Sequence, residues 1–301
     1  MLEELKKPKI VVVVGPTASG KTGMAVELAK RFNGEVVSAD SRQVYRGMDI
    51  GTAKVTTEEM QGIPHHLLDV ASPTEVYTAS DFARDAKIVI NDIISRGRLP
   101  IVAGGTFFYI DTLLGKVTVP EVPPDQVLRA TLEEKSAADL LSILESLDPD
   151  RAASIEPENQ RRLVRAIEIA TYLGKVPPQS PSDCPYDVLT IGLLINIETH
   201  GEIVKQRIIE RLNTGMADEV RTLLESGVTH ERLESFGLEY RYLSRYLRGL
   251  LDYDSMVEEL SVKTRQFAKR QMTWLKRDKT IQWFLKDDPE IFDVMKRFLT
   301  N

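Results

Sequence analysis

The chain of 301 residues has little cysteine, few aromatic residues and no long apolar run. Its one cysteine, Cys184, excludes an internal disulfide and is typical of proteins from a reducing cytosol. No apolar stretch reaches the ~20 residues that a membrane-spanning helix needs, and the first nine residues are charged and short, unlike a secretory signal peptide. We therefore expect a cytoplasmic protein that does not contact a membrane.

The sequence also lacks an overall excess of positive charge. Its formal net charge of −6 argues against a protein that coats nucleic acid non-specifically. A local basic run is present between Lys263 and Lys279, where Phe267 and Trp274 alternate with lysine and arginine. Basic residues among aromatic ones are typical of nucleic-acid surfaces, although an amphipathic core helix has a similar composition.

What the sequence does contain is a phosphate-binding loop. An apolar run at Val11–Val14 predicts a buried strand, and the residues after the loop have helical spacing up to Phe32. Between them the sequence matches the pattern G-x-x-x-x-G-K-[ST], whose backbone N–H groups and lysine bind phosphate and whose hydroxyl can bind Mg²⁺. The predicted phosphate ligands are Gly15, Pro16, Thr17, Ala18, Ser19, Gly20, Lys21 and Thr22, with Thr22 as the metal ligand.

A second predicted strand runs from Gly34 to Asp40. In parallel sheets, ligands bind beyond the carboxyl ends of the strands, so Asp40 and the residues up to Tyr45 are a candidate wall of a site. The alternative, that Asp40 only caps a turn, is equally compatible with the sequence.

A third predicted strand, Leu99–Ala103, ends on Gly104-Gly105-Thr106. Many phosphate-loop nucleotidases carry an acidic residue at such a strand end, and its absence here argues against an ordinary ATPase. Glycines would let a ligand approach the backbone closely, while a tight turn into the next helix is the alternative.

Two proline-rich breaks, one at Pro120–Pro124 and one at Pro177–Ser182, enclose a helical segment. Helices are predicted at 125–135, 137–147 and 158–173, a strand at 187–196, and helices from 200 to 277. The predicted fold is α/β, with a P-loop NTPase-like core, a mostly parallel sheet flanked by helices, a helical insertion domain and a helical C-terminal region. We place the core at 1–118 and 187–301 and the insertion at 119–186.

Two arginine pairs have the four-residue spacing that puts both side chains on one face of a helix. Arg161 and Arg165 are explained most simply as part of a solvated face with Glu158 and Glu168 as partners. The pair at Arg207 and Arg211 would face a phosphate if its helix lies over the glycine loop, and would otherwise be a surface feature.

The sequence resembles the tRNA dimethylallyltransferases, also called tRNA isopentenyltransferases. The resemblance spans nearly the whole chain, and its ordered set of motifs is far more specific than a phosphate loop alone. The motifs are GPTASGKT at 15–22, SADSRQVYRGMDIGTAK at 38–54, PHHLLD at 64–69, AGGTFFY at 103–109, RRLVRAIE at 161–168 and TRQFAKRQMTWLKRD at 264–278.

The resemblance implies transfer of a dimethylallyl group from dimethylallyl diphosphate to N6 of the adenine next to the anticodon, position 37 of tRNA. It implies that Asp40 takes the N6 proton, that Lys21 and Arg211 bind the diphosphate, and that Thr106 lies beside the substrate tRNA. Mg²⁺ is the implied cofactor. Because the diphosphate leaves intact when a carbon–oxygen bond breaks, no acidic residue is required after the third strand.

The resemblance also implies contacts with the anticodon stem-loop, whose target base must leave the stack to be modified. The insertion and the basic C-terminal helices would hold the stem-loop from either side, and we expect a monomer. The expected tRNA-binding residues are Asp40, Ser41, Arg42, Gln43, Thr106, Arg129, Arg161, Arg162, Leu163, Val164 and Arg165.

One segment departs from the family pattern. Many relatives have a glycine before the tyrosine in the segment Phe236–Arg241, where this chain has Glu239. Because Glu239 adds a negative charge to a surface that would face RNA, the predicted site leaves this segment out.

Three other functions are compatible with parts of the sequence. A small-molecule kinase would use the same ATP-binding type of loop and transfer phosphate. A nucleotide-dependent RNA-binding module would carry out no chemistry. A transferase acting on free adenine nucleotides would not need a large basic RNA-binding region.

Overall fold

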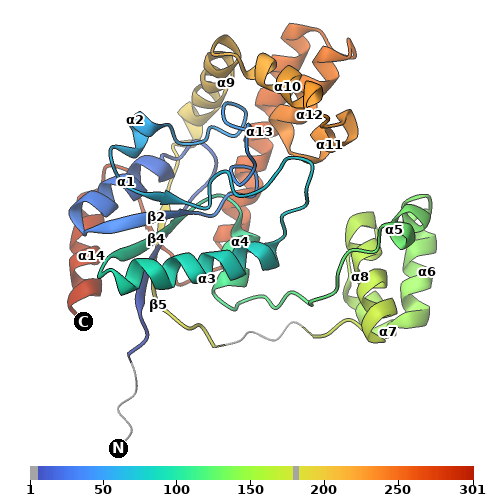
Figure 1. Cartoon of the computed structure of the whole chain (residues 1–301), viewed down its shortest axis with the longest axis horizontal. Helices are drawn as coiled ribbons and strands as arrows, with labels where there is room; N and C mark the ends of the chain where they lie inside the picture. The colour runs from blue at the N-terminus through green and yellow to red at the C-terminus, as the bar shows by residue number, and fades with distance from the viewer. Residues whose placement is uncertain (1–5, 179–182) are drawn as a thin grey trace, which may run out of the picture. The chain divides into compact units, whose positions relative to one another are not determined.

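The computed structural model describes residues 6–178 and 183–301, so four residues of the predicted break at 177–182 lie outside the described part. These residues form two compact units (Figure 1). The first unit comprises residues 6–115 and 183–301, and the second comprises residues 116–178.

The first unit is built on a parallel sheet with the strand order β3-β2-β4-β1-β5-β6. Each neighbouring pair of these strands is parallel, with Val12 of β1 opposite Val102 of β4 and Thr190 of β5. The strands are β1 (Lys9–Val14), β2 (Gly34–Ser38), β3 (His65–His66), β4 (Leu99–Ala103), β5 (Asp187–Leu193) and β6 (Gln282–Phe284). The predicted α/β fold with a phosphate-loop core is confirmed. The sequence did not reveal β3 and β6, because two or three residues are too few to show a period.

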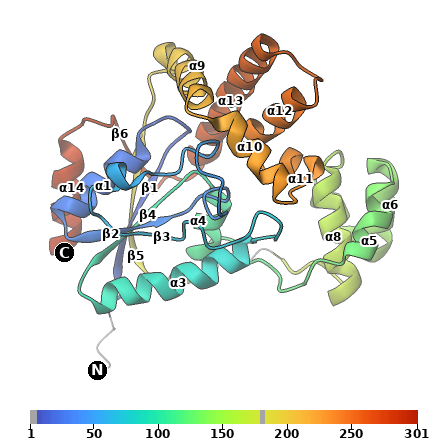
Figure 2. The ribbon, with the colours of Figure 1, turned by 45° about the horizontal axis from the view of Figure 1, so that its top comes forward.

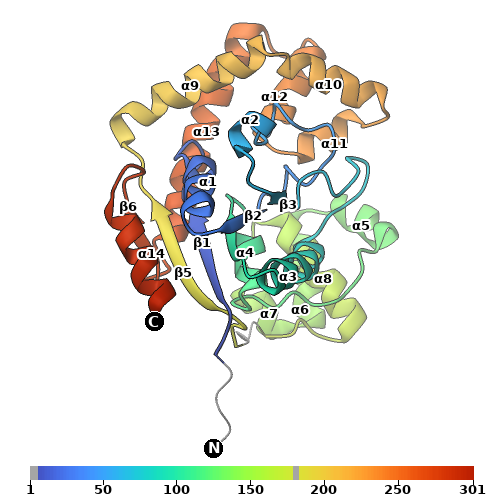
Figure 3. The same ribbon diagram turned by 60° about the vertical axis from the view of Figure 1, so that its left-hand side comes forward.

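Helices cover both faces of the sheet (Figure 3). One face packs on α1 (Lys21–Arg31) and α14 (Glu290–Thr300), with Val11 and Val13 in the shared core. Figures 2 and 3 show α3 (Ala79–Ser95) and α4 (Phe107–Leu113) on the other side. Phe82 and Ile90 of α3 are fully buried, as their helical spacing predicts.

Five helices lie beyond the carboxyl ends of the strands (Figure 1). They are α9 (Ile197–Asn213), α10 (Met216–Glu225), α11 (His230–Ser235), α12 (Leu238–Leu247) and α13 (Tyr253–Leu275). The predicted helical region is confirmed, but Gly215 and Gly237, with φ of 101° and 116°, break it into separate helices. These helices share a core with Val44, Tyr45 and Met48, so the chain after β2 is held against them. The short α2 (Thr57–Met60) lies in the same connection.

The second unit is a small helical bundle with its own core. It contains α5 (Gln126–Glu133), α6 (Ala137–Leu147), α7 (Pro149–Ser154) and α8 (Gln160–Leu173) around Leu140, Leu144 and Leu163. The sequence analysis missed α7, whose six residues are too few for a periodic pattern. Its start is nevertheless marked by Asp148, which accepts a hydrogen bond from Arg151 N, and by Pro149 at the first helical position. No helix among the described residues is long and apolar enough to span a membrane.

Candidate active site

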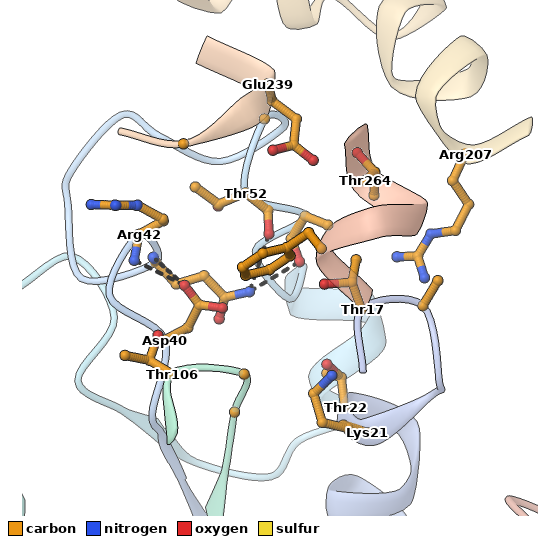
Figure 4. Close-up of a pocket in the computed structure, with 18 of the residues that line it drawn as sticks. Thr17, Lys21, Thr22, Asp40, Arg42, Thr52, Thr106, Arg207, Glu239 and Thr264 are labelled. Carbon is orange, nitrogen blue, oxygen red and sulfur yellow. Dashed lines mark hydrogen bonds between the residues drawn. The ribbon is translucent and has the colours of Figure 1, made fainter. Parts of the chain in front are cut away.

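A pocket of about 470 Å³ opens in the first unit at the carboxyl ends of β1, β2 and β4 (Figure 4). Four stretches far apart in the sequence meet there: the phosphate loop, the residues after β2, the end of β4, and the helices α9, α12 and α13. The predicted site residues that line it are Thr17, Ala18, Ser19, Gly20, Lys21, Thr22, Asp40, Ser41, Arg42, Gln43, Thr106 and Arg211.

The phosphate loop presents the N-terminus of α1 to this pocket. Gly20, with φ of 87°, precedes the helix, and no side chain caps the first turn, so the N–H groups there are available to an anion. The Lys21 ammonium donates to Pro16 O at 2.8 Å. Burial lowers the pKa of Lys21 to about 8, with Arg207 adding to this effect and Asp40 opposing it. Lys21 is therefore a cation whose charge is sensitive to pH near neutrality.

Gly15 and Pro16, which the sequence analysis placed among the phosphate ligands, do not line the pocket. A side chain at Gly15 would lie 2.7 Å from Ser19 Oγ and 3.0 Å from Leu193 O. Gly15 is therefore required because the loop packs closely against itself and β5.

Two helices of the C-terminal region hold Thr17 of the phosphate loop. Gln271 Oε1 on α13 accepts hydrogen bonds from Thr17 N at 2.9 Å and Thr17 Oγ1 at 3.1 Å. Gln271 Nε2 donates to Gly105 O at 3.2 Å, and His200 Nε2 on α9 lies 2.9 Å from Thr17 O. Gln271 therefore connects the phosphate loop with the end of β4. Sequence reasoning missed Gln271 and His200, because neither has a spacing that indicates this contact.

The carboxylate of Asp40 both caps a turn and lines the pocket. Its Oδ1 atom accepts hydrogen bonds from Arg42 N at 2.8 Å and Gln43 N at 3.4 Å. Thr106 Oγ1 accepts from Ser41 N at 2.9 Å and donates to Ser41 Oγ at 3.1 Å. These bonds fix the carboxylate at the pocket wall, so the two interpretations of Asp40 are compatible (Figure 4).

Gly104 and Gly105, which follow β4, have different roles in the structure. A side chain at Gly104 would overlap the Ala39 backbone, so Gly104 allows β2 and β4 to end close together. Gly105 lines the pocket, and its carbonyl accepts the bond from Gln271. Gly104 also lines the pocket, and the side chain that it lacks would have overlapped the protein's own backbone.

The arginine pair on α9 lies on the pocket side of its helix. Arg211 Nη1 donates to Gly51 O at 3.0 Å, and its Nη2 lies 3.4 Å from Glu239 Oε1. Arg207 also lines the pocket, and burial, together with the Arg211 charge, lowers the pKa of its guanidinium. No protein group in the described part of the chain accepts a hydrogen bond from the Arg207 guanidinium. The face of α9 that carries the pair is thus directed at the pocket that the glycine loop lines.

The segment around Glu239, which the sequence analysis left out of the predicted site, lines the pocket. Phe236, Gly237, Leu238, Glu239 and Tyr240 all line the pocket, because α12 begins there. Gly51 packs against the Tyr240 ring so closely that a side chain at Gly51 would lie 2.6 Å from it. The sequence showed the departure at Glu239 but did not show that this helix end faces inward.

A buried hydroxyl on α13 also faces the pocket. Thr264 is 3 % exposed, and its Oγ1 atom has no hydrogen-bond partner. A buried polar group without a partner costs roughly 1–3 kcal/mol. Figure 4 shows Thr264 between Glu239 and Arg207, so a polar ligand in the pocket could satisfy it.

The outward face of α13 carries the basic run. Phe267 and Trp274 are each 41 % exposed, with Arg270 over the Phe267 ring and Arg277 over the Trp274 ring. Phe267 also lines the pocket, so it lies where the exposed face of α13 meets the pocket. Leu260 and Leu275 of the same helix are buried. One helix therefore has both properties that the sequence left open, a core face and an exposed basic face with aromatic side chains.

The second unit uses several of the predicted tRNA-binding residues in its own packing. Leu163 and Val164, both predicted to bind tRNA, are 0 % and 7 % exposed, so their side chains belong to the core of the second unit and any contact with tRNA would have to use their backbone. Arg129 and Arg165 both bind the carboxylate of Glu168, which is 2 % exposed. Burying that carboxylate requires cations beside it, so these two arginines have a structural role. Arg161 and Arg162 remain exposed, with Arg162 paired to Glu156 at 3.1 Å.

The pocket is suited to a metal cation that is held mainly by the phosphate oxygens of a bound ligand and by few protein atoms. No cluster of three or more histidine, cysteine or acidic side chains suited to a metal occurs among the described residues. The exposed hydroxyl of Thr22 does line the pocket. Mg²⁺ commonly keeps several waters and is held by one or two protein oxygens together with substrate phosphates, so this donor set suits Mg²⁺ and not a cation that needs a protein cage.

Comparison with known proteins gives a consistent result. The family model described as IPP transferase matches residues 43–278. A tRNA dimethylallyltransferase of Anoxybacillus flavithermus is 39 % identical, with 95 % of this chain and 93 % of the relative covered. The crystal structure of the tRNA isopentenylpyrophosphate transferase of Bacillus halodurans has a TM-score of 0.71 at 35 % identity, covering 98 % and 95 % of the two chains. A eukaryotic dimethylallyltransferase acting on tRNA has a TM-score of 0.80 at 30 % identity, covering 96 % and 77 %.

Proposed function

The chain belongs to the IPP transferase family, and from this membership we propose that it transfers a dimethylallyl group from dimethylallyl diphosphate to N6 of the adenine at position 37 of tRNA. The observation that carries the proposal is the composition of one pocket. A phosphate loop and an arginine helix form one side, and Asp40 and Thr106 form the other. The cationic side of the pocket suits a diphosphate, and the side with Asp40 and Thr106 suits an adenine, so both substrates can bind in one pocket.

The alternative of a small-molecule kinase is not supported. The relatives are tRNA transferases, and β4 ends on Gly104, where many phosphate-loop nucleotidases carry an acidic residue that holds the metal. In the proposed reaction the bond that breaks joins carbon to oxygen. The phosphate loop is needed to stabilise a departing diphosphate, and no group has to activate water or a phosphate for attack.

The residues divide the reaction between them. The diphosphate leaves with the electron pair of the carbon–oxygen bond, and the cations of Lys21, Arg207 and Arg211 stabilise its charge. The N6 lone pair forms the new bond to carbon, and the Asp40 carboxylate takes the N6 proton. Thr106 holds the Asp40 turn through Ser41. Mg²⁺ bound by Thr22 and the diphosphate oxygens would supply further neutralising charge.

The surfaces proposed to bind the anticodon stem-loop are the exposed arginines of the second unit and the outward face of α13. Arg161 and Arg162 offer charge to phosphates. Phe267, Trp274 and their arginine neighbours offer stacking surfaces as well as charge. We also propose that the enzyme is a monomer and acts in the cytoplasm, where its tRNA substrate is available.

The proposal is tested by incubating the protein with labelled dimethylallyl diphosphate, Mg²⁺ and unmodified tRNA. We expect label to enter the RNA without ATP, and an otherwise identical RNA with guanine at position 37 to remain unlabelled. Labelling of the guanine variant, or a requirement for ATP, would overturn the proposed reaction. A parallel assay with γ-labelled ATP and small acceptors tests the kinase, for which we expect no transfer.

A further inference from the structure

Glu239 is one of three carboxylates, with Asp40 and Glu59, that line a pocket whose phosphate loop and arginines suit a phosphate compound. Glu239, in the first turn of α12, lines the same pocket as Lys21 and Arg207, and 21 % of its side chain is exposed. Figure 4 shows it across the pocket from Lys21 and Thr22. An acidic residue suits the N-terminus of a helix, but this position also opposes the binding of a phosphate compound.

Arg211 is the cation that Glu239 neutralises. Its guanidinium donates to Arg207 O at 3.2 Å and to Gly51 O at 3.0 Å, and its third contact is the Glu239 carboxylate at 3.4 Å. The Arg211 side chain is 17 % exposed, so solvent screens the pair much less than it would screen a surface pair. The carbonyl contacts carry no net charge, and within the described part of the chain Glu239 is the carboxylate at ion-pair distance from Arg211.

The neighbouring cation shows the contrast. Among the described residues, Arg207, one helical turn before Arg211 on the same face of α9, has no hydrogen-bond acceptor and no carboxylate within ion-pair distance, and Glu59, Glu210 and Glu239 act on its charge from further away. The 3.4 Å distance between Arg211 and Glu239 is also at the long end of a hydrogen bond. A stronger anion can therefore replace the carboxylate while the two carbonyl contacts keep Arg211 in place.

We propose that Glu239 sets the affinity of the diphosphate site, because it competes with the diphosphate group for Arg211 and so weakens the binding of donor and of released pyrophosphate. The inference rests on the proposed function, in which Arg211 binds the diphosphate. Binding exchanges one anionic partner of Arg211 for another, and the Glu239 carboxylate must then lie beside a second anion. Removing the charge of Glu239 removes both the competition for Arg211 and the repulsion between Glu239 and the bound anion.

The test measures binding of Mg²⁺-pyrophosphate by calorimetry and its competition with dimethylallyl diphosphate. Glu239→Gln keeps the shape of the side chain, and we expect it to bind pyrophosphate about five- to thirtyfold more tightly. Arg211→Gln should bind it more weakly, and in the Arg211→Gln background the effect of Glu239→Gln should disappear. Glu258→Gln is the matched control, because Glu258 pairs with Lys205 on the surface and should leave binding unchanged.

The outcomes separate the inference from the proposed function. If Arg211→Gln weakens binding while Glu239→Gln has no effect, the inference is overturned and the role of Arg211 stands. If Arg211→Gln leaves the pyrophosphate affinity unchanged, Arg211 does not bind the diphosphate and this part of the proposed function is overturned. If Glu239→Gln changes only the KM for tRNA, Glu239 contacts RNA and the inference is overturned. Thermal melting checks that each variant is folded. Glu239→Ala must also bind pyrophosphate more tightly than the wild type, as expected for Glu239→Gln.

Discussion

Two helices of this protein carry arginine pairs with the same four-residue spacing, and the pairs have different surroundings. On α9, Arg207 and Arg211 line the pocket. On α8, Arg165 binds the buried carboxylate of Glu168 and the carbonyl of Val122, while Arg161 is exposed. Spacing decides which side chains share a helix face, but the acceptors nearby decide whether their charge remains available to a ligand.

From this comparison we predict that charge in the pocket acts on donor binding and chemistry, whereas exposed charge in the second unit acts on RNA affinity. If this division is correct, substitutions in the two regions change different kinetic constants. The expected effects decrease from the carboxylate at the reacting atoms to the exposed arginine on α8.

The largest effect is expected for Asp40→Asn, which keeps the size of the side chain and removes its basicity. We expect kcat to fall by about 10²–10⁴-fold, because the N6 proton loses its acceptor. The tRNA affinity, measured by fluorescence anisotropy, should be retained. A protein with unchanged kcat and weaker tRNA binding would make Asp40 a binding residue, and unchanged function altogether would favour an RNA-binding module without chemistry.

The next largest effect is expected for Arg207→Gln. Loss of a charge-assisted contact to the diphosphate should lower kcat/KM for the donor by roughly 10- to 100-fold. Arg161→Gln is the matched control, because the same change in the second unit should leave the donor kinetics unaltered. Equal effects of the two substitutions on donor kinetics would break the division between the regions.

Lys21 should give the pocket a pH dependence. Because burial lowers its pKa to about 8, Lys21 is charged below that pH and loses its charge as the pH rises through it. We expect kcat/KM for the donor to fall by up to about tenfold per pH unit above pH 8. Lys21→Arg should remove this fall, because a guanidinium stays protonated. An identical profile for wild type and Lys21→Arg would show that another group titrates.

A smaller effect is expected for the buried hydroxyl of Thr264. Thr264→Val keeps the shape and removes the donor, and we expect the KM for dimethylallyl diphosphate to rise by about fivefold. Thr264→Ser should restore the wild-type value. Thr273→Val is the control on the same helix, because the Thr273 hydroxyl already donates to Lys269 O at 3.0 Å. A raised KM in the control would point to a general change in α13.

The smallest effect is expected at the exposed arginine of the second unit. Arg161→Glu should raise the KM for tRNA about threefold at physiological salt and should reduce the salt dependence of tRNA binding. The KM for dimethylallyl diphosphate should not change. A tRNA affinity that is independent of this substitution at every salt concentration would make Arg161 an ordinary surface residue.

The parts of the fold that could be predicted are those with a local pattern. The run at Val11–Val14, the glycine loop and the helical spacing after it gave the first strand, turn and helix in their correct places. The turn at Asp40 could be placed at a strand end because parallel strands end at one edge of the sheet. The sequence also showed the helical insertion, because its breaks and periodic helices are long enough to show a pattern.

The parts that could not be predicted depend on contacts between distant segments. The start of α12 lines the pocket because Tyr240 packs on Gly51, which is 189 positions earlier in the chain. Leu163 and Val164 were assigned to tRNA within a motif, although their positions on α8 face the core of the second unit. Arg129 and Arg165 needed the position of Glu168 before their role in packing could be seen.

The hydrogen bonds of Gln271 set an order for the maturation of the enzyme. A ribosome makes the phosphate loop before α13, and the Gln271 side chain that joins Thr17 to Gly105 follows the loop by about 250 residues. While the chain is still being synthesised, the nascent protein has a phosphate loop without this support. The pocket is completed only after α13 has been synthesised and has docked, so the phosphate loop acquires its full support late in folding, when the segments that line the pocket come together.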